Sequence, residues 1–231
     1  MKAFKVHEYG KGAKFIEQEV KKPETKPGHV LIEVKATSLN PVDHKLLKAN
    51  LGINPALPAT LHMDVAGIIV EVGEGVATFK VDDEVYGCAG GLQGEAGDIE
   101  GALADFMLAD SHLIALKPKS SSFSEAAALP LVAITAWEGL FDRAHINAED
   151  HILIHAATGG VGHIGIQLAK QHGARVATTV SSEDKAEIAK NLGADDIIYY
   201  RDETVKDYTQ RLTNGKGFDV VFDTIGGGNL D

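Results

Sequence analysis

One stretch of the sequence decides the fold, and it reads Ile152-Leu153-Ile154-His155-Ala156-Ala157-Thr158-Gly159-Gly160-Val161-Gly162-His163-Ile164-Gly165. An apolar run breaks into glycines and then resumes with helical spacing, which predicts a strand, a tight turn and a helix. Residues 157–162 match the dinucleotide-binding fingerprint, with Ala157 in place of the first glycine. Gly159 would let the backbone approach a pyrophosphate, and Gly162 would let helix and strand pack closely. The predicted cofactor-binding residues of this turn are Ala157, Thr158, Gly159, Gly160, Val161 and Gly162. A glycine-rich turn without a ligand is the alternative.

The surrounding sequence decides between these two readings. Strand patterns alternate with helix patterns after residue 150, and such alternation predicts a parallel, doubly wound sheet. The glycines then fall between a strand and a helix, which favours a dinucleotide site. The predicted strands are 152–157, 175–180, 196–199 and 218–223, and the predicted helices are 161–172, 183–192 and 204–212. Two further helices are expected just before this region, at 124–129 with Ser124 as N-cap and at 131–141.

The first half of the chain has a different pattern of predicted elements. Short β-like runs are separated by turn residues, which predicts an antiparallel barrel or sandwich. The clearest runs are 4–6, 30–36, 66–72, 84–86 and 104–109. Residues 88–101 hold five glycines between Gly90 and Gly101 and little apolar material, so we expect a mobile loop there. Lys117-Pro118-Lys119 marks a boundary.

Composition narrows the class of protein. The chain has 231 residues, of which 44% are hydrophobic and 24% charged, and this is enough to bury a sizeable core. The net charge of -11 argues against a nucleic-acid partner or an anionic membrane, because both require basic patches. Cys88 is the single cysteine, which excludes an internal disulfide framework and suits a reducing compartment. No apolar run approaches the length of a membrane span, and we expect a cytoplasmic protein.

The end of the second predicted strand indicates which dinucleotide is bound. A site for NAD uses Asp or Glu there to accept the ribose hydroxyls, whereas this strand ends Thr179-Val180-Ser181-Ser182. Lys185 follows one turn later as a candidate cation for a 2′-phosphate. Ser181, Ser182 and Lys185 are therefore predicted cofactor residues. Alternatively, Ser182 only caps the helix and the charges after it are solvated.

The sequence resembles the medium-chain dehydrogenase/reductases, and among them the zinc-independent quinone oxidoreductases. The resemblance covers essentially the whole chain and rests on Ser38-Leu39-Asn40-Pro41-Val42-Asp43 with Lys45, residues 64–73, Leu129-Pro130 with Thr135-Ala136-Trp137, and residues 157–162. It implies a GroES-like β-barrel over residues 1–122 and a Rossmann NADP-binding domain over residues 123–231. It also implies reduction of a quinone or an α,β-unsaturated carbonyl by NADPH.

The resemblance indicates which positions would hold the zinc ligands of zinc-dependent relatives. Zinc-dependent relatives bind a catalytic zinc with Cys, His and Cys or Asp, and the matching positions hold Asn40, Met63 and Leu131. None of these is an ordinary zinc ligand, so we expect no metal site. The four-cysteine structural zinc lobe is missing as well. An alternative site would use Asp43, His44, His62 and Asp64, although Asp43 and Asp64 match family positions with structural roles.

By the same resemblance Asn40, Asp43 and Lys45 are the predicted catalytic residues, and Thr135 joins Asn40 at the nicotinamide end of the cleft. Lys45 stands where zinc-dependent relatives often carry a proton-relay His, and it could stabilise an enolate or relay a proton. Many quinone-reductase relatives have Tyr at this position, which leaves the acceptor open. Alternatively, Lys45 is only a surface lysine, and Asn40 only forms a turn before Pro41.

The resemblance also supports NADPH. NADPH-using relatives place a Lys after the second strand and a Tyr after the third strand on the 2′-phosphate, and Lys185 and Tyr200 match these positions. The alternative for Tyr200 is packing at a strand end.

Four Rossmann strands are predicted before residue 226, whereas the full fold has six. We therefore expect a shortened chain in which strand 218–223 lies at the edge of the sheet. Family dimers often pair through the outer strands that are missing here. A homodimer is therefore possible, but the resemblance does not fix the oligomeric state. The first hypothesis is an NADPH-dependent quinone or enone oxidoreductase without zinc. The alternatives are a catalytically incomplete NADP(H)-binding protein and a zinc-dependent alcohol dehydrogenase.

Overall fold

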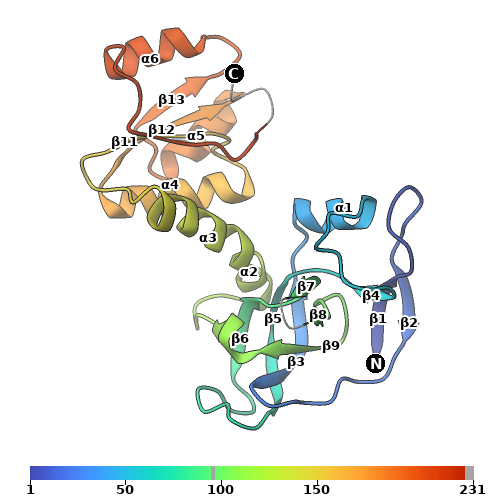
Figure 1. The fold of residues 1–231 in the computed structure, drawn as a ribbon. Helices are drawn as coiled ribbons and strands as arrows, with labels where there is room; N and C mark the ends of the chain where they lie inside the picture. The colour runs from blue at the N-terminus through green and yellow to red at the C-terminus, as the bar shows by residue number, and fades with distance from the viewer. Residues whose placement is uncertain (95–96, 227–231) are drawn as a thin grey trace. The chain divides into compact units, whose positions relative to one another are not determined.

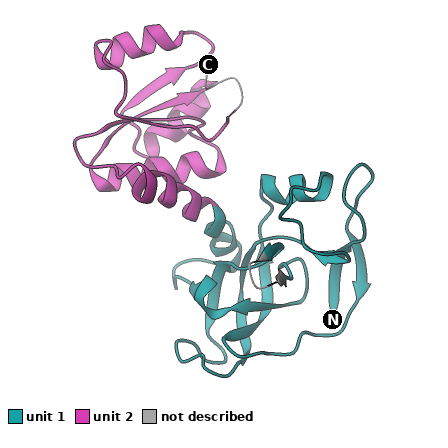
Figure 2. Ribbon diagram, in the orientation of Figure 1, with its two compact units in different colours: residues 1–131 teal, residues 132–231 magenta. Residues whose placement is uncertain are grey.

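A computed structural model describes residues 1–94 and 97–226 of the chain (Figure 1). The chain divides into two compact units, Met1–Leu131 and Val132–Asp231 (Figure 2). The domain boundary expected after residue 122 lies nine residues before the division between these units. Among the described residues, no helix has the length and apolar character needed to cross a membrane.

The first unit consists mainly of antiparallel strands, as expected for a GroES-like barrel (Figure 1). A five-stranded sheet has the order β10-β6-β5-β3-β9, a three-stranded sheet has the order β2-β1-β4, and β7 pairs with β8. The elements are β1 (Lys2–Val6), β2 (Ile16–Glu19), β3 (His29–Thr37), α1 (Pro41–Lys48), β4 (Ala59–Thr60), β5 (Asp64–Val72), β6 (Glu84–Cys88), β7 (Leu92–Gly94), β8 (Gly97–Ile99), β9 (Phe106–Asp110), a 3-10 turn η1 (Ser111–Leu113), β10 (Ile114–Leu116) and α2 (Phe123–Ala127).

Two long strands, β3 and β5, organise this unit. Val30 and Ile32 of β3 and Val65 and Ile69 of β5 are fully buried in one cluster. The β3–β5 register shifts twice, between Leu31/Ile32 and Val34/Ala36, and such bulges bend and twist a sheet. A Cβ atom on Gly67 would lie 2.2 Å from the carbonyl oxygen of Glu33, so only glycine fits where the two strands approach.

Several short elements differ from the sequence expectations. The segment 88–101, expected to be a mobile loop, contains the β7–β8 hairpin, apart from residues 95–96, which lie outside the described residues. Strands β2, β4 and β10 were not predicted, because each is two to four residues long and is defined by its partner strand rather than by its own pattern. The N-cap of α2 is Ser122 rather than Ser124, since Ser122 forms a capping box with Glu125.

The second unit contains the predicted parallel sheet. Its strand order is β13-β12-β11-β14, so the order reverses between β11 and β14. This order is the 3-2-1-4 portion of a Rossmann sheet, and the predicted fold class is confirmed. The elements are α3 (Pro130–Trp137), which begins two residues before the unit boundary, a π-helical turn η2 (Glu138–Arg143), β11 (His151–Ile154), α4 (Gly160–His172), β12 (Arg175–Val180), α5 (Glu183–Asn191), β13 (Asp196–Tyr199), α6 (Val205–Thr213) and β14 (Val220–Phe222).

Helices cover both faces of this sheet. Ile152 and Ile154 of β11 pack in one cluster with Ile166 of α4 and with α5, whereas Leu153 packs in a second cluster with Tyr208 of α6. Successive strand residues point to opposite faces, so this division places α4 and α5 on one face and α6 on the other. The central strands are accordingly buried on both faces and mostly apolar, with Thr178 and Thr179 of β12 as buried polar exceptions.

Candidate functional site

The glycine turn after β11 has a backbone that only particular residues can adopt. Ala156 has a positive φ of 58°, in the left-handed region. A Cβ atom on Gly162 would lie 2.1 Å from the carbonyl oxygen of Ala156, so the start of α4 can approach the turn only with glycine at 162. Ala157 is 1% exposed and belongs to the core cluster under the sheet. The turn therefore fixes where α4 begins.

The N-terminus of α4 is open to a ligand. Gly159 is the N-cap, and in the described part of the chain no side chain caps the first turn. The unpaired N–H groups of Gly160, Val161 and their neighbours, together with the helix dipole, make this end suitable for an anion. Thr158 and Gly159 line the adjoining cleft.

A cleft of about 850 Å³ lies at the carboxyl ends of the strands. Each of the four strands of the sheet is followed by a segment that lines it, which is where open α/β sheets bind ligands. The lining residues are His155, Ala156, Thr158, Gly159, Thr179, Val180, Ser181, Lys185, Tyr200, Arg201, Asp202, Glu203, Thr204, Val205, Tyr208 and Ile225. Thr158, Gly159, Ser181, Lys185 and Tyr200 are thus brought together as predicted from the sequence.

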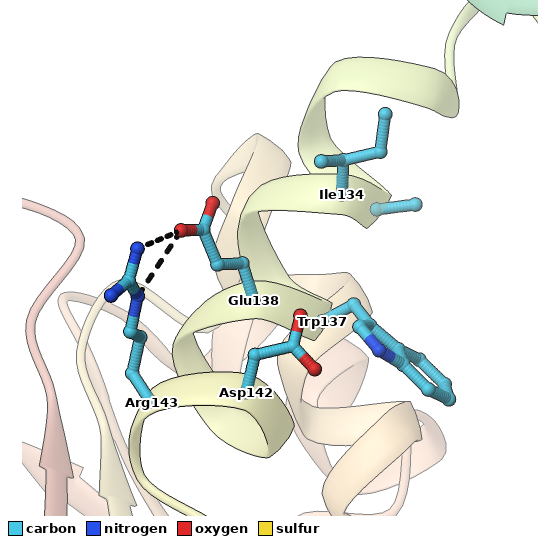
Figure 3. Close-up of a pocket in the computed structure, with 6 residues that line it drawn as sticks. Ile134, Trp137, Glu138, Asp142 and Arg143 are labelled. Atoms are coloured by element: carbon cyan, nitrogen blue, oxygen red, sulfur yellow. Dashed lines mark hydrogen bonds and ion pairs between the residues drawn. The ribbon is translucent and has the colours of Figure 1, made fainter. Parts of the chain in front are cut away.

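Two other predicted cofactor residues, Ser182 and Thr135, do not line this cleft. Ser182 is the N-cap of α5, and its side chain forms no capping hydrogen bond within the described residues. Thr135 lies on α3 and is exposed. Figure 3 shows residues that line a hollow along α3 and η2, among them Arg143 and Glu138, which pair through atoms 2.8 Å apart. This hollow shares no lining residue with the cleft.

His155 and Arg201 are among the cleft residues that the sequence did not single out for binding. His155 has its Nδ1 atom 3.2 Å from the hydroxyl of Thr179, and burial lowers its pKa, opposed by the carboxylate of Asp223. Arg201 holds its guanidinium 5.7 Å from the ring centroid of Tyr200. The sequence signal for Arg201 was its position directly after Tyr200.

The predicted catalytic residues lie in the first unit, with Asn40 and Asp43 at the N-terminus of α1 and Lys45 in its last turn. The Asn40 side chain is 6% exposed, and its Nδ2 atom donates to Ser38 Oγ (3.0 Å) and to Asp64 Oδ2 (2.8 Å). A carboxylate only accepts, so the contact with Asp64 fixes which end of the amide is nitrogen. Both Nδ2 hydrogens of Asn40 are therefore used, and only its carbonyl oxygen is available to a ligand.

Asp43 holds the backbone of Asn40 in place at the start of α1. It is completely buried, and its Oδ2 atom accepts from the backbone N–H of Asn40 at 2.7 Å. Burial raises the pKa of Asp43, opposed by the Asn40 hydrogen bond and by nearby His62, while burial lowers the pKa of His62. Asp43 thus acts on the helix start and on Asn40, and its buried carboxylate is not exposed to a substrate.

Lys45 lies on the exposed face of α1, in its last turn. His44 beside it is also exposed. Neither side chain packs in the core, so Lys45 is accessible to a ligand. Its exposed position also fits the alternative, a surface lysine without a catalytic role.

The residues considered for zinc are engaged in other contacts of the first unit. Met63 is 4% exposed and packs in an apolar cluster that includes Leu131. Asp64, fully buried, accepts from Asn40 and from the backbone N–H of Leu131 (2.9 Å). Among residues 1–94 and 97–226, no group of three or more His, Cys, Asp or Glu side chains is arranged to hold a metal ion.

Cys88 pairs in register with Asp64 on the neighbouring strand. Burial, assisted by the carboxylates of Asp64 and Asp43, raises the pKa of its thiol to about 12. The thiol is protonated at neutral pH and is a poor nucleophile.

Comparison with known proteins places this architecture in a family. Residues 26–119 match the family model described as alcohol dehydrogenase GroES-like domain, and residues 160–231 match the model described as zinc-binding dehydrogenase. Quinone oxidoreductase from Rattus norvegicus is 32% identical over 232 residues, which cover 100% of this chain and 68% of the relative. The chain belongs to the medium-chain dehydrogenase/reductases, in their quinone oxidoreductase branch. The resemblance drawn from the sequence is confirmed.

Other members of this family are also similar. The 2-methylene-furan-3-one reductase of Solanum lycopersicum is 41% identical over 232 residues, covering 99% of this chain and 58% of the relative. An alcohol dehydrogenase superfamily protein from Novosphingobium aromaticivorans has a solved structure with a TM-score of 0.92 and 40% identity, covering 100% of this chain and 68% of that one. Escherichia coli quinone oxidoreductase complexed with NADPH gives a TM-score of 0.85 at 29% identity, with 100% and 68% covered.

The chain spans only part of these medium-chain dehydrogenase/reductases. It covers 58% of the tomato reductase and 58% of the NADPH-dependent alkenal/one oxidoreductase of Arabidopsis thaliana.

Proposed function

We propose that the protein is an NADPH-dependent oxidoreductase that reduces quinones or α,β-unsaturated carbonyls without zinc. One observation carries the proposal: the cleft at the strand ends combines an uncapped helix N-terminus with a lysine and a tyrosine, and no acid follows β12 at Ser181 or Ser182. Relatives named as quinone oxidoreductases and as an NADPH-dependent alkenal/one oxidoreductase support the substrate class.

The cleft fits this cofactor at both of its anionic parts. Gly162 lets α4 begin close to the turn, so the first N–H groups of the helix face a pyrophosphate. Lys185 supplies a positive charge, and Tyr200 a ring and a hydroxyl, for the 2′-phosphate. An acid at the end of β12 would repel that phosphate, and the sequence has serines there.

When bound, NADPH would supply the hydride, and the residues of the chain then have to position the acceptor and stabilise its developing charge. Asn40 offers only an acceptor oxygen, so it suits an N–H group of a ligand and cannot stabilise an oxyanion. Lys45 is the residue of α1 that we propose to donate from Nζ to the acceptor oxygen. Asp43 is a positioning residue for Asn40.

Zinc independence rests on the donor set. Asn40 commits its amide nitrogen to Asp64, while Met63 and Leu131 lie in an apolar cluster. None of the three supplies a thiolate, imidazole or carboxylate. We therefore propose that the carbonyl oxygen of the acceptor is stabilised by protein donors.

The experiment measures NADPH oxidation by the purified chain with a small panel of quinones and 2-alkenals, with and without a chelator, alongside metal analysis. We expect turnover with NADPH that the chelator does not change, and no stoichiometric zinc. NADPH binding without turnover on the whole panel would favour the catalytically incomplete NADP(H)-binding protein instead. One zinc per chain, with activity lost on chelation, would overturn the zinc-independent mechanism.

A further inference from the structure

Among the described residues, Arg201 is the one arginine that pairs with no carboxylate. The sequence contains four arginines, and Arg143, Arg175 and Arg211 each form an ion pair with a carboxylate. In the described part of the chain Arg201 forms no side-chain hydrogen bond or ion pair, and its guanidinium lies over the ring of Tyr200. Its side chain lines the cleft and is exposed. A guanidinium with five donors and no acceptor is available there.

The backbone places Arg201 beside the end of β12. The N–H of Tyr200 donates to the carbonyl oxygen of Val180 at 3.4 Å, directly before Ser181. The N–H of Asp202 donates to the carbonyl oxygen of Tyr199 at 2.8 Å, which closes a turn around Arg201. These two hydrogen bonds bring the residues after β13 to the strand end where an adenosine ribose is bound in this fold.

The acids near Arg201 are largely compensated. Asp202 and Glu203 also line the cleft. Glu203 is paired with Arg211, whose Nη2 and Nε atoms lie 2.6 and 3.1 Å from its carboxylate oxygens. Glu183 and Asp184 precede Lys185 in the first turn of α5, but neither lines the cleft. Among the charged residues that do line it, Lys185 and Arg201 are opposed by Asp202, since Glu203 is paired with Arg211, so this end of the cleft favours an added anion.

We propose that Arg201, which follows β13, is a second cation for the 2′-phosphate of NADPH and a determinant of cofactor specificity, acting together with Lys185, which follows the adjacent parallel strand β12. The inference rests on the proposed function, because it deepens the same cofactor site. A phosphomonoester carries close to two negative charges at neutral pH, which one lysine does not balance. A planar guanidinium bonds two phosphate oxygens at once, and the Tyr200 ring holds it in place.

The test compares binding of NADPH, NADH, 2′,5′-ADP and 5′-AMP to the wild type, Arg201→Gln and Arg201→Lys by calorimetry. Arg143→Gln is the matched control, since Arg143 is exposed, paired with Glu138 and outside the cleft. Loss of one bidentate charge-assisted contact should weaken NADPH and 2′,5′-ADP binding by roughly tenfold or more in Arg201→Gln. Binding of NADH and 5′-AMP should stay unchanged, and Arg201→Lys should show an intermediate loss.

The outcomes separate this inference from the function on which it rests. A wild type that binds NADPH no more tightly than NADH would contradict the proposed NADPH dependence itself. A wild type that prefers NADPH, with Arg201→Gln equal to it for both 2′-phosphorylated ligands, would overturn the role of Arg201 and leave the proposed function intact. Equal weakening of NADH and NADPH would also overturn it, because it would indicate a general loss of the cleft.

Discussion

The side-chain amide of Asn40 donates a hydrogen bond to the buried carboxylate of Asp64, with 2.8 Å between Nδ2 and Oδ2. The same carboxylate accepts from Ser38 Oγ at 2.5 Å and from the backbone N–H of Leu131 at 2.9 Å. Asp64 thus joins the start of α1, the β3–α1 connection and the start of α3 within one unit. Its role is to hold Asn40 in one orientation.

Asp64→Ala should destabilise the first unit by about 3 kcal/mol, because one buried donor and two partly buried donors lose their common acceptor. Denaturant unfolding of the variant measures the loss. Glu8→Ala, at an exposed position of the same unit, should change stability very little. An Asp64→Ala protein as stable as Glu8→Ala would show that the hydrogen bonds of Asp64 contribute little.

Gly162→Ala should weaken NADPH binding at least tenfold and destabilise the second unit by roughly 1–3 kcal/mol, because the new Cβ atom would lie 2.1 Å from a backbone oxygen. Gly165→Ala is the matched control on the same helix: its Cβ atom would lie at an ordinary 3.6 Å from its neighbours. This control should keep NADPH binding and gain up to about 1 kcal/mol from helix propensity. Calorimetry and thermal unfolding measure both, and equal behaviour of the two variants would refute the close approach.

Ser181→Asp should reverse the cofactor preference. A carboxylate at the end of β12 would repel the 2′-phosphate and accept the ribose hydroxyls of NADH. We expect NADPH affinity to fall by roughly tenfold, on the order of 1.4 kcal/mol, while NADH affinity rises. Titration of both cofactors measures the change, with Ser120→Asp as the control for added charge, since Ser120 is exposed outside the cleft. NADPH affinity unaffected by Ser181→Asp would place the 2′-phosphate elsewhere.

Lys45→Ala should lower kcat with the best quinone or enone by roughly 10- to 100-fold, because a donor to the developing oxyanion is lost. The KM for NADPH should not change, since Lys45 is not among the residues that line the cofactor cleft. Lys48→Ala tests the loss of a charge on the same helix, where Lys48 is also exposed. Equal kcat values for the two variants would support a surface lysine without a catalytic role.

His155 should make the second unit sensitive to mild acid. Burial lowers its pKa in the folded state below the ordinary value of about 6.5, so between these values the unfolded chain binds more protons. The free energy of unfolding should therefore fall as the pH drops through this window. His155→Asn, which can still bond Thr179, should show a smaller decrease, and exposed His44→Asn should match the wild type. Parallel pH dependence in all three proteins would contradict a pKa lowered by burial.

Much of the fold could be predicted from local patterns. The spacing of apolar residues and glycines indicated the four strands and three helices of the second unit, and β12 and β13 begin and end at the predicted residues. Short strands such as β4 could not be found this way, because two residues carry no pattern and their pairing with β1 defines them. The hairpin β7–β8 was missed for the same reason.

The sequence by itself determined the class of site: a glycine turn between strand and helix, serines in place of an acid after β12, and a lysine and a tyrosine at the following positions. Only the tertiary structure decided which polar groups are free. Asn40 commits one amide hydrogen to Ser38 nearby and the other to Asp64 on β5, and the hydrogen bond from Tyr200 to Val180 brings the segment of Arg201 to the end of β12. The physical reason is range: backbone preference and periodicity act over a few residues, whereas hydrogen-bond partners from distant segments are set by strand register and packing.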